Sequence, residues 1–254
     1  LDQPSDLGKS KPENYGKKFY GPSTLRKGIE NSRNLMTIRI AQYLGMEKVA
    51  EIANRTGVME NMPNVLSMAL GAGETSLIDL TAAYASFVNG GKKVEPSLID
   101  RIQDRRGKNI FLENFAACTN CDEPYIEENP MPKLVNSSES IFDEAKSYQM
   151  VSILKGAVDR GTGRKTKIDG IEIAGKTGTT NNNTDAWFIG FTSDLIIGVY
   201  AGFDKPKSLG KRETGSSVAV PIFRDFVKNY YQEKPILPFT IPNGIELIKI
   251  NYDT

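Results

Sequence analysis

The spacing of apolar residues along the chain predicts mainly helices in its first two thirds and mainly strands in its last third. In the clearest helical segment, Leu77, Leu80, Ala83, Tyr84 and Phe87 follow a 3.6-residue period after a polar cap at Thr75 or Ser76. The same reasoning predicts helices over residues 25–29, 35–44, 47–54, 77–87, 145–158 and 219–231. Gly45 and the run Asn89-Gly90-Gly91 are typical of helix ends.

Three alternating segments, over residues 171–179, 186–192 and 195–203, predict strands separated by short polar turns. Their connections are too short for crossover helices, so we expect antiparallel pairing. A further hairpin is predicted over residues 96–112, and residues 113–138 read as an insertion or long loop. These elements favour the α+β class, an antiparallel sheet flanked by helices.

Composition excludes several classes of function. The 254 residues include 32 basic and 31 acidic side chains, so the charge balance gives no support for a nucleic-acid partner. The chain has no histidine, which excludes His-dependent triads and His-containing zinc sites, and we expect neither metal nor cofactor. No run is apolar enough for a signal peptide or membrane span, so any anchor is expected outside this sequence.

The two cysteines, Cys118 and Cys121, have a spacing shared by redox pairs and half zinc sites. No second pair exists, so this chain cannot supply a four-thiolate metal site by itself. Their loop-like surroundings favour a local disulfide, and a pair of free thiols remains the alternative.

The segment Lys176-Thr177-Gly178-Thr179 carries the most specific chemistry. On an edge strand, Lys176 and Gly178 would share one side and the two threonines the other. Gly178 would let an extended peptide approach the backbone, while the threonine hydroxyls could bind a carboxylate beside the positive potential of Lys176. The alternative is a tight turn with a solvated lysine.

The triplet lies within Gly-Lys-Thr-Gly-Thr-Thr at 175–180, which follows Arg-Gly-Thr-Gly at 160–163 and precedes Asp-Ala-Trp-Phe-Ile-Gly-Phe at 185–191. Together these segments resemble the transpeptidase domain of penicillin-binding proteins. Ser32-Arg33-Asn34 and its flanks resemble the Ser-x-Asn region of the class A members, which are bifunctional peptidoglycan synthases. Arg33 replaces the aspartate of the β-lactamase pattern and so disfavours a β-lactamase. The resemblance extends from about residue 15 to 226.

The resemblance implies a partial penicillin-binding protein or serine β-lactamase-like transpeptidase fold over residues 1–240, followed by a tail over 241–254. It implies that Ser32 relays a proton and that Asn34 positions the substrate and the lysine. Lys176 would stabilise charge and assist proton movement. Thr177, Gly178, Thr179 and Thr180 would bind the substrate. The implied partners are peptidoglycan stem peptides ending in D-Ala-D-Ala and β-lactam antibiotics, at the periplasmic face of the bacterial inner membrane.

The serine nucleophile of this chemistry needs a lysine one helical turn later. Two segments fit Ser-x-x-Lys, namely Ser152 to Lys155 and Ser208 to Lys211, but both follow Ser32, whereas the family places the nucleophile before Ser-x-Asn. We therefore expect the nucleophile on an upstream piece of the same protein, which would be a further partner, and we expect this chain to be inactive alone. The alternative is a non-catalytic penicillin-binding sensor or peptide-binding module.

Overall fold

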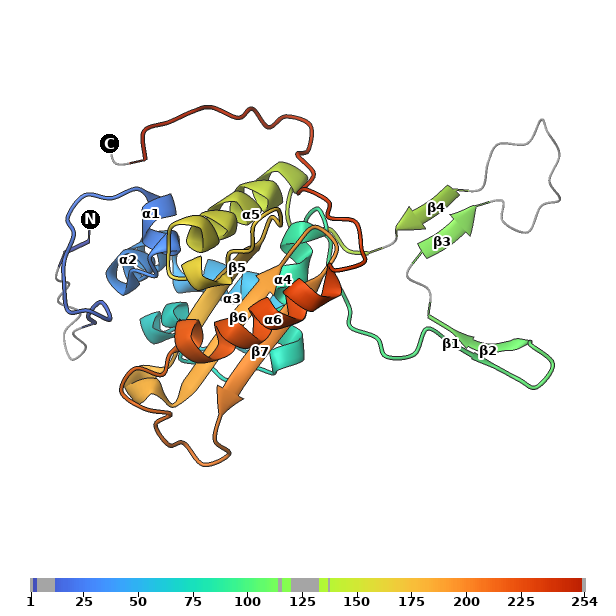
Figure 1. The fold of residues 1–254 in the computed structure, drawn as a ribbon, viewed down its shortest axis with the longest axis horizontal. Coiled ribbons are helices and arrows are strands. Elements are labelled where there is room, and N and C mark those ends of the chain that lie inside the picture. The colour runs from blue at the N-terminus through green and yellow to red at the C-terminus, as the bar shows by residue number, and fades with distance from the viewer. Residues whose placement is uncertain (1, 4–11, 114–115, 120–132, 137, 253–254) are drawn as a thin grey trace.

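The computed structural model describes residues 2–3, 12–113, 116–119, 133–136 and 138–252 (Figure 1). Its helices lie close to the predicted segments, and a residue of the predicted type caps three of them. Thr24, Ser76 and Asp143 accept a backbone N–H at the start of the first, fourth and fifth helix. The helices are α1 (Leu25–Glu30), α2 (Asn34–Leu44), α3 (Met46–Arg55), α4 (Leu77–Val88), α5 (Glu144–Asp159) and α6 (Val220–Tyr230).

The central sheet contains β5 (Ala174–Thr179), β6 (Asp185–Phe191) and β7 (Ile196–Gly202) in the order β5-β6-β7. Both pairings are antiparallel, which confirms the prediction made from the short connections. Thr177 lies opposite Phe188 and Lys176 opposite Ile189. Among the described residues β5 pairs only with β6, so its other edge is unpaired there.

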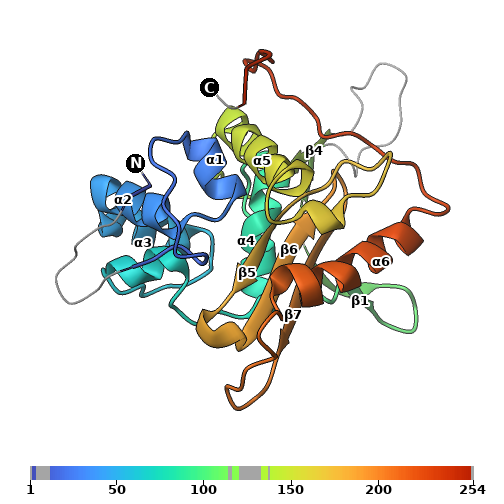
Figure 2. The same cartoon turned by 60° about the vertical axis from the view of Figure 1, so that its left-hand side comes forward.

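Helices cover both faces of this sheet (Figures 1 and 2). On one face, Phe223 of α6 packs edge-to-face on Phe188 of β6, with 4.9 Å between ring centroids. On the other face, Phe191 of β6 joins Val151 and Leu154 of α5 in a second buried cluster. Phe188 and Phe191 are an odd number of positions apart, so the pleat directs them to opposite faces. The α+β class predicted from the sequence is confirmed.

Two hairpins project from the body of the fold (Figure 1). The first joins β1 (Arg101–Gln103) to β2 (Asn109–Leu112) and confirms the predicted hairpin. The second joins β3 (Ala116–Thr119) to β4 (Lys133–Asn136), inside the segment predicted to be an insertion or loop. The predicted disulfide lies outside the described residues, because Cys121 falls in the gap and the side chain of Cys118 is not described.

Short irregular helices occupy places that the periodicity did not predict. They are η1 (Leu66–Leu70), η2 (Arg164–Thr166), η3 (Asn181–Asn183) and the π-helical turn η4 (Gly215–Ala219). Gly215 sits so close to the sheet that a Cβ there would overlap the carbonyl oxygens of Gly178 and Trp187. After α6, the chain runs back across the molecule to the neighbourhood of α1 (Figure 1).

Candidate active site

Lys176 and Ser32 meet at the free edge of β5, although 144 residues separate them. Lys176 Nζ donates a hydrogen bond to Ser32 Oγ at 2.9 Å and a second to the carbonyl oxygen of Thr177 at 3.0 Å. Ser32 lies in the turn between α1 and α2, with a φ of +53° that serine seldom adopts. The two halves of the sequence motif therefore form one site.

Burial lowers the pKa of Lys176 from its usual 10.5 to about 8. Loss of hydration disfavours the charged ammonium, so the neutral amine becomes accessible near neutral pH. An amine that gains and loses a proton in this range, with a serine hydroxyl at hydrogen-bond distance, can pass protons to and from a reacting group.

The backbone of β5 presents polar groups along its free edge. The N–H of Thr180 donates to the carbonyl oxygen of Asp185 on β6, at 3.2 Å. Because N–H groups alternate in direction along a strand, those of Thr179 and Thr177 point to the opposite edge, where no described strand pairs with β5. That edge can accept an extended peptide as an additional strand.

The hydroxyls of Thr177 and Thr179 lie on the same side of β5, as the sequence predicted. Thr177 Oγ1 is 2.7 Å from Thr162 Oγ1, and one of the two donates to the other. Thr179 Oγ1 accepts the N–H of Gly215 at 3.1 Å. The Thr162–Thr177 pair keeps one hydroxyl hydrogen that is not used between them, and Thr179 keeps its own. The site can therefore donate two hydrogen bonds to a carboxylate.

The side chain of Thr180 is engaged in the turn that follows β5. Its hydroxyl bonds Asp185 Oδ2 at 2.9 Å and the Thr184 hydroxyl at 2.6 Å, and Asp185 also accepts from Tyr200 at 2.9 Å. Burial alone would raise the pKa of Asp185, but hydrogen bonds from Thr184, Thr180 and Tyr200 lower it overall. This network fixes the end of the strand that carries Thr179.

Asn34 begins α2, two residues after Ser32, and its amide donates to the carbonyl oxygen of Glu13 at 3.0 Å. Its predicted role toward the substrate and Lys176 stays a prediction. The sequence reasoning did not single out Thr162 as a site residue, although the Arg-Gly-Thr-Gly motif that contains it was part of the resemblance. No local pattern pointed to Gly215.

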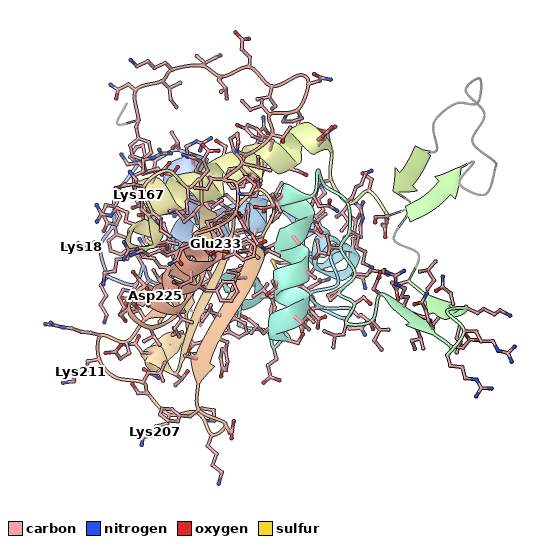
Figure 3. The ribbon with its side chains drawn as sticks, turned by 45° about the vertical axis from the view of Figure 1, so that its right-hand side comes forward. Lys18, Lys167, Lys207, Lys211, Asp225 and Glu233 are labelled. Atoms are coloured by element: carbon pink, nitrogen blue, oxygen red, sulfur yellow. The ribbon has the colours of Figure 1, made fainter. Side chains whose placement is uncertain are left out.

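The contacts of the two Ser-x-x-Lys segments agree with their rejection as the nucleophile. Lys155 Nζ is 2.8 Å from Asp159 Oδ2, and Ser152 Oγ accepts from Arg26 at 3.2 Å. Ser208 Oγ accepts the N–H of Gly210 at 3.2 Å. The Lys211 side chain projects away from the fold (Figure 3).

The lowered pKa of Lys176 gives a testable dependence of stability on pH. Below pH 8 Lys176 is protonated in both the folded and the unfolded protein, and the buried charge destabilises the folded state. Between pH 8 and 10.5 the folded state releases the proton first, so the free energy of unfolding rises with pH through this group. We expect the Lys176→Met variant to be more stable than the unchanged protein at pH 7, with an advantage that shrinks between pH 8 and 10.5. The urea unfolding midpoints of the two proteins across this range measure it, and a pH-independent difference would contradict it.

Comparison with known proteins gives one consistent result. The family described as the penicillin-binding protein transpeptidase domain matches residues 2–228. A relative named penicillin-binding protein 1A, from Rickettsia conorii, is 45% identical over 250 residues, which cover 96% of this chain and 31% of that protein. Penicillin-binding protein 1A of Pseudomonas aeruginosa is 32% identical over 272 residues, covering 95% of this chain and 33% of the relative.

Solved structures agree with these relatives. The crystal structure of penicillin-binding protein 1A from Haemophilus influenzae superposes with a TM-score of 0.81 at 29% identity, over 95% of this chain and 40% of that one. PonA1 from Mycobacterium tuberculosis, solved in complex with penicillin V, has a TM-score of 0.77 at 19% identity, over 95% of this chain and 65% of that one. At that identity PonA1 supports the fold alone. The chain spans about a third of the length of the curated relatives that it matches.

Proposed function

The chain belongs to the penicillin-binding protein transpeptidase family, and we propose that it forms most of the walls of a serine-type D,D-transpeptidase site. The reaction cross-links peptidoglycan stem peptides that end in D-Ala-D-Ala. The observation that carries the proposal is the hydrogen bond from Lys176 to Ser32. It lies beside a strand edge that is unpaired in the described part of the chain and that bears two threonine hydroxyls. We take residues 1–240 as the portion of the transpeptidase domain and 241–254 as its tail.

The donor peptide lies along the free edge of β5 in this account. Thr177 and Thr179 donate hydrogen bonds to its terminal carboxylate, or to the carboxylate of a β-lactam, and Lys176 adds positive potential. Gly178 keeps a side chain off the peptide path, while Thr180 holds the following turn. The outward N–H of Thr179 supplies one oxyanion donor, and the nucleophile's own N–H supplies the other.

The acylated serine comes from a part of the protein outside this chain. Its hydroxyl oxygen attacks the carbonyl carbon between the two D-alanines, the terminal D-Ala leaves with a proton, and an ester to the enzyme remains. A peptide amine then attacks that ester and forms the cross-link, and the proton that the amine loses restores the serine hydroxyl. Ser32 and Lys176 move protons in both steps, and Asn34 positions the substrate.

The proposed setting is the periplasmic face of the bacterial inner membrane. No helix among the described residues is long and apolar enough to cross a membrane. In this proposal the anchor lies in another part of the protein, as does the nucleophile-bearing piece with which this chain completes the site.

The direct test is D-Ala release from stem peptides by the full-length protein, with cross-linked products followed by mass spectrometry. We expect D-Ala release and cross-links, both abolished by benzylpenicillin. Cross-links that form without release of D-Ala, or release that benzylpenicillin leaves unchanged, would contradict the proposed function.

A further inference from the structure

Glu30 is a fully buried carboxylate at the end of α1, two residues before Ser32. Its side chain has no exposed surface, yet cations surround it. Arg160 donates to both carboxylate oxygens, at 2.6 and 3.0 Å, and Arg26 lies 3.6 Å away. The Tyr252 hydroxyl donates to it at 2.8 Å. Removing the carboxylate or one of its partners is costly, because it leaves a buried polar or charged group without its partner.

Two glycines shape the space that Glu30 occupies. A Cβ on Gly156 would overlap the Glu30 carboxylate, and a Cβ on Gly161 would overlap its carbonyl oxygen. The same carbonyl oxygen accepts the N–H of Thr162 at 3.1 Å. Glu30 is thus held at both its side chain and its backbone by the end of α5 and the loop that follows.

This contact connects to the proposed active site on two sides. On one side, the left-handed turn at Ser32 lies two residues after Glu30, and the Ser32 N–H donates to the carbonyl oxygen of Ile29 at 3.0 Å. On the other side, Thr162 bonds the Thr177 hydroxyl. Glu30 therefore lies between the turn that presents Ser32 and the strand that presents Lys176 and Thr177.

We infer that Glu30, through its pair with Arg160, is a positioning residue that sets the place of Ser32 relative to Lys176 during acylation. This inference rests on the proposed function. Glu30 does not touch the reacting groups and acts through the turn it anchors. The chemistry depends on this alignment, because a displacement of about 1 Å can cost about 100-fold in rate.

The C-terminal tail takes part in the same cluster. Tyr252 lies 222 residues from Glu30, and its ring also faces Arg160, with 4.8 Å from the guanidinium carbon to the ring centroid. The tail crosses the molecule to reach this point (Figure 1). We assign Tyr252 the role of completing the hydrogen bonds of the Glu30 carboxylate.

The test is the acylation of the full-length protein by benzylpenicillin, with the rate constant and the final amplitude measured separately. We expect Glu30→Gln to lower the rate constant by about 100-fold while the folded protein still reaches full acylation. Arg160→Lys keeps the charge but loses the paired hydrogen bonds, so its rate constant falls too. The double variant should be no slower than the slower single variant, because the two residues act as a unit.

A milder variant and a matched control accompany these. Tyr252→Phe removes one hydroxyl and no charge, so it should fold and lower the rate constant by a smaller factor. Asp159→Asn breaks the neighbouring ion pair with Lys155 on the same helix, and its rate constant should stay unchanged.

Three results would overturn the inference, and they are distinguishable. A fall in amplitude with an unchanged rate constant would assign Glu30 to stability alone. If Glu30→Gln and Tyr252→Phe both reached full acylation with an unchanged rate constant, Glu30 would not position Ser32. If the unchanged protein formed no acyl adduct, the proposed function would fall, and the inference with it.

Discussion

Replacing Lys176 by alanine is expected to lower the rate constant for acylation of the full-length protein by benzylpenicillin by about 10²–10⁴-fold, the usual contribution of a positioned acid or base. The substitution removes the amine that donates a hydrogen bond to Ser32. Burial lowers the pKa of this amine to about 8. The substitution also removes the positive potential beside the threonine hydroxyls. Stopped-flow mixing with the antibiotic, followed by mass spectrometry, measures the rate constant.

Lys155 provides the matched control for this experiment. It belongs to one of the two rejected Ser-x-x-Lys segments, and its amine pairs with Asp159 on the same helix. Lys155→Ala should leave the rate constant unchanged. Acylation that survives Lys176→Ala at the normal rate, or that is lost in Lys155→Ala, would mean that the site has been placed wrongly.

The second large effect is expected from Phe223→Ala in α6. Phe223 is 1% exposed and packs on Phe188 of β6, in the cluster that supports the sheet behind Thr177. Truncation of a buried phenylalanine leaves a cavity and costs about 3–5 kcal/mol of unfolding free energy. Urea-dependent hydrogen exchange at the β6 amides of the full-length protein measures the change where it occurs.

Phe226 lies on the same helix but is 54% exposed, so it serves as the control. We expect Phe226→Ala to change the free energy of unfolding by no more than about 0.5 kcal/mol. The acylation rate constant of molecules that remain folded should be normal in both variants, because neither side chain touches the site. Equal losses of stability in both variants would show that α6 does not pack as described.

The sequence predicted the elements that position this site because their signals are local. Helical spacing located α4 and α5, and the pleat required Lys176 and Thr177 to face opposite sides of β5. The contacts of Lys176 with Ser32, and of Thr177 with Thr162, agree with that alternation. The motif resemblance brought Ser32 and Lys176 into one site, since spacing alone could not join residues so far apart.

Polar contacts between residues far apart in the sequence could not be predicted from the sequence. Glu30 and Arg160 are 130 positions apart, and neither lies in a pattern that marks a buried ion pair. The bond from the Thr180 hydroxyl to Asp185 within the turn was not predicted either, and the role of Thr180 toward a substrate stays a prediction. The π-helical turn at Gly215 likewise depends on close backbone packing that no periodicity records.

The most direct test of the account is to identify the serine that benzylpenicillin acylates in the full-length protein. Proteolysis of the adduct and mass spectrometry of the peptides would locate it. The account predicts a penicilloyl group on a serine outside this chain, within a Ser-x-x-Lys segment upstream of Ser32. An adduct on Ser32, Ser152 or Ser208 would contradict it by placing the nucleophile within the chain. The absence of any adduct would instead favour a non-catalytic module that has kept the walls of the site.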